Sequence, residues 1–157
     1  MNTAKNIFRR AILFMLCGSA YYCIELLWRG HSHISMLLLA GFLGVFCIDA
    51  PNNIWGYELD YLVQIGISTL LCTLGEGIVG LIVNIWLGLK VWDYSELPFT
   101  FFWGQCNIFF VVAWILLIGL IGIPVCDAYW YYICKDSEQP YYKICGKYIF
   151  RMPQRKE

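Results

Sequence analysis

Charged residues are scarce in this chain. Only 14% of its 157 residues are Asp, Glu, Lys or Arg, whereas 60% are hydrophobic and 18% are aromatic. A soluble globule needs more polar surface than this, so the composition predicts an integral membrane protein. The sequence also shows no internal repeat and no low-complexity segment, which disfavours an inverted-repeat transporter contained in one chain.

Motifs for several chemistries are missing as well. No GxxxxGK[ST] sequence is present to cradle phosphates, so the chain lacks an ATPase motif of its own. The eight cysteines are scattered, which favours a packing role, and a His31-x-His33 pair in a loop lacks the fixed geometry of a zinc site. We therefore expect no metal, no cofactor and no enzyme. An intramembrane enzyme that uses His31, His33 and Asp93 is the alternative.

Four apolar runs are present, at 8–28, 34–48, 61–89 and 101–125. A membrane-spanning helix needs about 20 residues, and only the second run is short. The third contains Gly75 and Gly77, so it is either one tilted helix or two half-helices. We predict an all-α polytopic membrane protein with four transmembrane helices in residues 1–134. A basic, aromatic cytoplasmic tail is expected at 135–157, and the first helix is expected to be retained rather than cleaved.

The basic residues are distributed unequally between the two sides of such a bundle. The side without the termini carries only Arg29 and Lys90. The side that holds both termini carries Lys5, Arg9, Arg10, Lys135, Lys143, Lys147, Arg151, Arg155 and Lys156. The positive-inside rule then places both termini in the cytoplasm. The basic tail is expected to contact anionic lipid headgroups of the bilayer rather than nucleic acid.

Glu76 lies near the middle of the third run, where an unpartnered charge would cost several kcal/mol. Asn84, Gln105 and Asn107 are expected at a similar depth, facing Glu76. The four side chains would line a polar cavity open to the outside, as a site for an ion or a small cationic or polar substrate. The alternative is a hydrogen-bond network between helices that holds no ligand.

Small and polar residues recur along one face of the third run, at steps of three or four. They are Gly66, Thr69, Thr73, Gly77, Gly80, Asn84 and Gly88. Small residues let membrane helices approach closely, so we expect this helix-packing face at the centre of the bundle or in a contact with a second copy or another membrane subunit.

The first and third loops are expected on the same outer side, where they would form a polar cluster. The first supplies Glu25, Arg29, His31 and His33, and the third supplies Trp92, Asp93 and Tyr94. Glu25 and Arg29 stand four residues apart, the spacing of neighbours on a helix, so an ion pair is predicted between them.

These motifs resemble a family of small bacterial membrane proteins, the ABC-transporter permeases of the CmpB-like type. The similar stretches are Arg29-Gly30-His31-Ser32-His33, Glu76 in its helix, Val83 to Gly88, Val91-Trp92-Asp93-Tyr94-Ser95, Pro98-Phe99 and Gly104-Gln105. The resemblance implies a multi-pass permease of the bacterial cytoplasmic membrane that works with a separate ATPase. A non-transporting scaffold or accessory subunit is the main alternative, and a holin-like pore or defence effector is a third.

Overall fold

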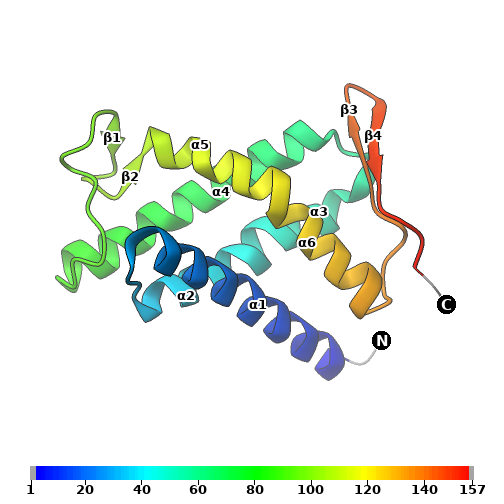
Figure 1. Ribbon diagram of the computed structural model, residues 1–157, viewed down its shortest axis with the longest axis horizontal. Coiled ribbons are helices and arrows are strands. Elements are labelled where there is room, and N and C mark those ends of the chain that lie inside the picture. The colour runs from blue at the N-terminus through cyan, green and yellow to red at the C-terminus, as the bar shows by residue number, and fades with distance from the viewer. Residues whose placement is uncertain (1–2, 156–157) are drawn as a thin grey trace.

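The computed structural model describes residues 3–155, and it is mostly helical (Figure 1). Four of its helices are long and apolar enough to cross a membrane: Thr3–Arg29, Ile34–Glu58, Tyr61–Trp86 and Ile108–Ile133. The prediction of four such helices is therefore confirmed. In the second, third and fourth long helices, the α-helical, π-helical and 3-10 parts follow one another without a break.

The first long helix is α1 (Thr3–Arg29). The second joins α2 (Ile34–Phe42), the π-helical η1 (Leu43–Asp49), α3 (Ala50–Trp55) and the short 3-10 turn η2 (Gly56–Glu58). The third joins α4 (Tyr61–Gly80) and the π-helical η3 (Leu81–Trp86). The fourth joins α5 (Ile108–Leu117), η4 (Ile118–Gly122), α6 (Ile123–Ala128) and η5 (Tyr129–Ile133).

The second helix is longer than its apolar run suggested. The stretch 49–60 between the second and third apolar runs is almost entirely helical, and only Leu59 and Asp60 separate the second helix from α4. Proline at position 51 cannot donate to the carbonyl four residues back, and the π-helical η1 directly before it relaxes that register. The same arrangement recurs in the fourth helix, where η4 precedes Pro124.

The third helix is continuous through Gly75 and Gly77, so it is one helix rather than two half-helices. The fourth begins at Ile108 and not at residue 101. Residues ahead of it form a small hairpin of β1 (Thr100–Phe101) and β2 (Cys106–Asn107), whose connection contains Phe102, Trp103 and Gly104 at positive φ.

The tail is not simply extended chain. It forms the antiparallel hairpin of β3 (Tyr141–Ile144) and β4 (Lys147–Arg151), and β3 packs on η2 and α4. The expectation of an all-α fold is therefore wrong at two places, the β1–β2 and β3–β4 hairpins, although both are short. Lys143 forms a 2.8 Å ion pair with Glu58, which ties β3 to the end of the second helix.

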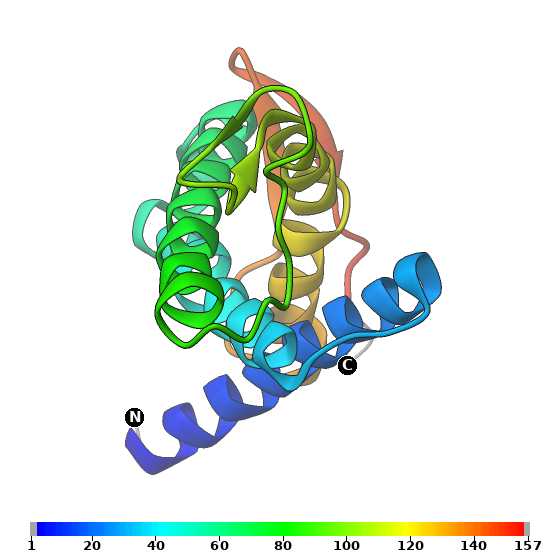
Figure 2. The same cartoon turned by 90° about the vertical axis from the view of Figure 1, so that its left-hand side faces the viewer.

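Close approach of α1 and α2 depends on small residues. A Cβ added at Gly18 would lie 2.5 Å from the carbonyl oxygen of Leu37, and one at Gly44 would lie 2.5 Å from the Cys17 Cβ. Membrane helices gain most of their association energy from such close packing. The glycines of the first two helices therefore make a contact that sequence analysis missed. Figure 2 shows that α1 crosses the other helices obliquely.

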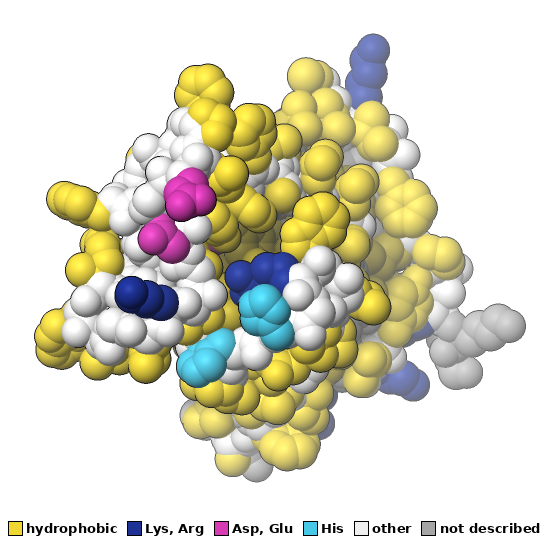
Figure 3. Space-filling model, turned by 60° about the vertical axis from the view of Figure 1, so that its left-hand side comes forward, with side chains coloured by type: hydrophobic (Ala, Val, Ile, Leu, Met, Phe, Trp, Pro, Cys, Tyr) yellow, Lys and Arg dark blue, Asp and Glu magenta, His cyan; other side chains and the backbone are white. Residues whose placement is uncertain are grey.

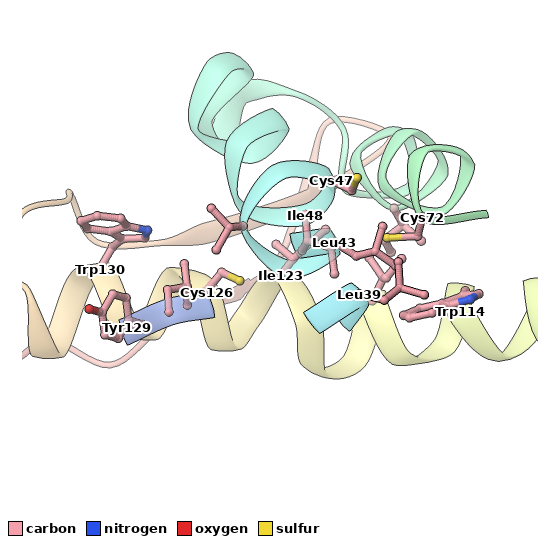
Figure 4. Close-up of a cluster of buried hydrophobic side chains, with 14 of the residues drawn as sticks. Leu39, Leu43, Cys47, Ile48, Cys72, Trp114, Ile123, Cys126, Tyr129 and Trp130 are labelled. Carbon is pink, nitrogen blue, oxygen red and sulfur yellow. The ribbon is translucent and has the colours of Figure 1, made fainter. Parts of the chain in front are cut away.

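The core lies between the second helix, α4 and the fourth helix. Figure 4 shows Leu39, Leu43 and Ile48 of the second helix pointing toward Ile123 and Trp114 of the fourth. Residues Thr69, Thr73, Gly77, Gly80 and Asn84 of the small-residue face are buried within this chain, whereas Gly66 and Gly88 are exposed. Gly77 packs on Phe102 and Cys106, and Gly80 on Gln105. Most of that face is thus used inside the bundle.

Both ends of the chain lie at one end of the helical bundle (Figure 1). The opposite end carries the turn between α1 and α2 and the long connection from residue 87 to residue 107, which brings the first and third loops to the same end as predicted.

Candidate functional site

Glu76 is buried in α4, with 4% of its surface exposed. Its Oε2 accepts a hydrogen bond of 3.0 Å from the Trp114 indole nitrogen, and its Oε1 accepts from the Tyr94 hydroxyl at 3.4 Å. The second distance is long for an O–H donor, so Trp114 is the main partner. Among residues 3–155, no lysine, arginine or histidine forms a salt bridge with this carboxyl group.

A cavity of about 370 Å³ adjoins Glu76. Helix α1, the Tyr94 loop and α5 provide the other walls, with Tyr21, Ile24, Glu25, Trp28, Arg29, Tyr94, Phe110, Ala113, Trp114 and Leu117. Figure 3 shows a hollow among hydrophobic side chains at this end of the molecule, with one basic side chain at its edge and the two histidines beyond that side chain. A small molecule can therefore reach the neighbourhood of the buried carboxyl group.

The second carboxyl group of this cavity has its own partners. Glu25 Oε1 accepts from Arg29 Nη2 at 2.6 Å, which confirms the predicted ion pair, and its Oε2 accepts from the Ser32 hydroxyl at 2.5 Å. Because Arg29 is already paired with Glu25, Glu76 is the acidic group of the cavity without a cationic partner. Arg29 Nε is buried and has no hydrogen-bond partner in the described chain.

Aromatic rings form much of the cavity wall. Tyr21 stacks on Trp114 with ring centroids 5.5 Å apart and planes at 7°, and Tyr94 stacks on Phe110 at 4.4 Å and 17°. Aromatic faces carry a negative quadrupole that attracts cations, and stacking fixes the orientation of the rings. The cavity thus combines an acid with electron-rich walls.

Asn84, Gln105 and Asn107 do not line this cavity, contrary to expectation. Asn84 donates to Gln105 Oε1 at 2.7 Å and accepts from the Val91 backbone nitrogen at 2.7 Å. Asn107 caps the start of α5 by accepting from Phe109 N, and it donates to Pro98 O at 2.7 Å. All three amides are buried, and they hold the 87–107 connection onto the helices.

The predicted outer polar cluster is divided by the structure. Glu25, Arg29 and Tyr94 meet in the cavity, whereas Trp92 is buried and donates from its indole nitrogen to Gln105 O at 3.1 Å. The two histidines bond locally: His33 caps α2 by accepting from Ser35 N, and His31 contacts Arg29 O.

Asp93 also bonds locally. Its Oδ1 accepts from the Ser95 hydroxyl at 2.5 Å and from the Ser95 backbone nitrogen at 2.9 Å. These bonds favour the charged form and hold the pKa of Asp93 below its ordinary value. The Asp93-Tyr94-Ser95 stretch therefore shapes the loop that positions Tyr94.

Two further buried acids lie in the helices. Asp127 accepts from Asn52 Nδ2 at 2.5 Å and from the Tyr142 hydroxyl at 2.8 Å, which joins the second helix, the fourth helix and β3. Asp49 accepts from the Trp130 indole at 2.7 Å, with Arg10 3.8 Å away. Sequence analysis missed Asp127 as a buried group because its apolar run was ended at residue 125; an acid only two residues after the end of that run was the available signal.

No group of three or more His, Cys, Asp or Glu side chains is arranged to bind a metal ion within residues 3–155. The cavity offers a ligand charge, aromatic contact and hydrogen bonding. No known protein family, curated protein or solved structure matches this chain.

Proposed function

We propose that this chain is a permease-type protein of a bacterial cytoplasmic membrane, with four spanning helices and both termini in the cytoplasm, and that it binds its substrate at Glu76. One observation carries the proposal: a carboxyl group with 4% exposure and no cationic partner borders a cavity of about 370 Å³. An acid at bilayer depth is costly, and such groups commonly serve ion or substrate pathways.

Charge favours a cationic substrate. The formal charges of the cavity are −1 at Glu25, +1 at Arg29 and −1 at Glu76, which sum to −1 when all three are ionised. A monovalent organic cation restores neutrality, and the faces of Tyr21, Tyr94 and Trp114 supply further attraction. An anion would instead meet two carboxylates.

The resemblance to the CmpB-like permeases supports the same function, and it implies that a separate ATPase supplies the energy. Transport also needs a second conformation open to the other side. The π-helical segments η1, η3 and η4 lie in three of the long helices, and such segments are frequent at functional sites of helices. We propose them as the places where the helices rearrange.

The test is uptake of radiolabelled tetraethylammonium, down its concentration gradient, into vesicles that contain the purified protein. We assign the ATPase only to uptake against a gradient, so this downhill uptake needs the permease alone. Glu76→Gln keeps the size of the side chain and removes its charge, so we expect uptake to fall to the level of empty vesicles. Glu96→Gln changes an exposed acid of the outer loop and should leave uptake unchanged. Equal uptake by the wild type and Glu76→Gln, or no uptake above empty vesicles by either, would reject the proposal.

A non-transporting accessory subunit is the second candidate, and the β3–β4 hairpin favours it. All five residues of β4 are exposed, including Tyr148, Ile149 and Phe150, and only β3 pairs with this strand. An exposed apolar edge strand is suited to pairing with another chain. This function predicts a stoichiometric partner in detergent extracts of the native membrane, lost on Ile149→Lys; a wild-type chain that purifies alone contradicts it.

A further inference from the structure

An apolar groove continues the Glu76 cavity along the bundle. It has a volume of about 90 Å³ and shares Tyr21, Ile24, Trp114 and Leu117 with the cavity. Its remaining walls come from α1, the second helix and the fourth helix: Leu16, Cys17, Ala20, Ala40, Leu43, Gly44, Ile48, Ile121, Gly122, Val125 and Cys126. None of the residues that line this groove is charged.

The combined site has about the length of one lipid tail. From Arg29 at the polar end to Leu16 in the groove, α1 advances 13 residues, or about 20 Å at roughly 1.5 Å per residue. Half of a bilayer's hydrocarbon core is about 15 Å thick. The site is therefore slightly longer than one leaflet, and a single hydrocarbon chain that starts at its polar end would extend through the groove to about the middle of the bilayer.

The groove is open along its side. Ile24 is 43% exposed, Ile121 is 50% exposed and Val125 is 38% exposed, although all three line the groove. In a chain that crosses a membrane, these side chains border the lipid. A hydrocarbon chain can thus enter sideways from the bilayer, without passing through water.

We propose that the ligand of this site is a cationic amphiphile: a protonated amine lies against Glu76, and its single hydrocarbon chain lies in the groove between α1 and the fourth helix. The net −1 charge of the Glu25, Arg29 and Glu76 set selects the cationic head over a zwitterionic or anionic one. This inference rests on the proposed function, because it names the substrate class of the same cavity.

A photoreactive probe tests the inference without relying on transport. The protein, in lipid nanodiscs of dioleoylphosphatidylcholine, is exposed to a twelve-carbon alkylammonium with a diazirine at its chain end, or to the alcohol of the same chain. We expect the ammonium probe to label groove residues of α1 and the fourth helix, as mapped by mass spectrometry. Labelling by the alcohol, and labelling of Glu76→Gln by the ammonium probe, should be weaker by at least about tenfold, as the loss of a charge-assisted contact predicts.

A second variant tests the groove itself. Ala20 is exposed and lines the groove, so Ala20→Trp should fill the groove and abolish labelling there. Ala11→Trp, on the same helix and exposed but outside the groove, is the control. Equal groove labelling by the alcohol, or labelling spread over lipid-facing residues outside the groove, overturns the inference. Tetraethylammonium uptake that depends on Glu76 would then still support the permease function with a chainless substrate.

Discussion

Asn84→Leu should release the outer connection while leaving the helices in place. Leucine branches at the same atom as asparagine, although it is larger, and it cannot replace the hydrogen bonds of the amide. The change leaves the Val91 backbone nitrogen and Gln105 Oε1 without the partners that lie 2.7 Å away in the wild type. The loop that carries Tyr94 should therefore open more readily.

The magnitude follows from those two groups. An unsatisfied buried polar group costs about 1–3 kcal/mol, which gives about 2–6 kcal/mol for two. Val91 is only half-buried, so water can replace part of its lost bond, and we expect about 2–4 kcal/mol. At about 1.36 kcal/mol for each tenfold change, local opening should become about 30-fold to 1,000-fold more frequent.

Hydrogen exchange measures this opening residue by residue. The informative amide is that of Tyr94, which donates to Gly104 O at 2.7 Å across the loop. Its exchange should accelerate in Asn84→Leu, whereas amides of the β3–β4 hairpin should keep their wild-type rates. Asn53→Ala is the matched control, because the exposed Asn53 bonds only to Asp49 O of its own helix. Wild-type exchange at Tyr94 in Asn84→Leu, or equal acceleration in Asn53→Ala, would refute the reasoning.

Three further predictions concern the loops and the tail. Gly104→Ala should lower the free energy of unfolding by about 2 kcal/mol or more, seen as a lower melting temperature, because the φ angle of Gly104 is +85° and the new Cβ would meet Ser95 Oγ. Gly66→Ala, with open space around the new Cβ, should leave the melting temperature unchanged. Tyr142→Phe removes the donor to Asp127 and should speed tryptic cleavage in the β3–β4 hairpin, unlike Tyr148→Phe on an exposed residue. The hydrogen bonds from Ser95 to Asp93 stabilise the loop above about pH 4, and this contribution is lost as pH falls through the lowered pKa of Asp93. Ser95→Ala should raise the pKa of Asp93 in a carboxyl NMR titration, and an unchanged pKa would contradict the assigned cause.

The end of the second helix and the start of the fourth show which helix boundaries the local sequence can predict. Asn107 before an apolar run is an ordinary helix N-cap, and it does begin α5. The aromatic residues from Phe101 to Trp103, however, are as hydrophobic as the residues of a membrane-spanning helix. Hydropathy therefore cannot reveal that Phe102 and Trp103 adopt positive φ angles in a turn. The second apolar run likewise ends at residue 48, yet the helix continues through Pro51 to Glu58. A π-helical segment ahead of this proline removes the conflict, and sequence periodicity does not register that segment.

The buried acids also show which contacts can be predicted from local spacing and which depend on the tertiary fold. Glu25 and Arg29 were paired correctly because their contact depends only on the four-residue spacing along one helix. The partners of Glu76 could not be found this way, since Tyr94 and Trp114 lie 18 and 38 residues away. Asparagine and glutamine side chains seemed the natural partners by polarity, yet the fold uses them to anchor a loop.

Hydropathy, helix length and the depth of one acid are properties of single segments, so the amino-acid sequence alone determined four apolar helices and a carboxyl group inside one of them. Which side chains surround that group depends on how the helices cross and where the connection from 87 to 107 folds back. Only the tertiary structure therefore decided that the acid meets aromatic rings and an arginine-paired glutamate, and that an apolar groove leads away from it.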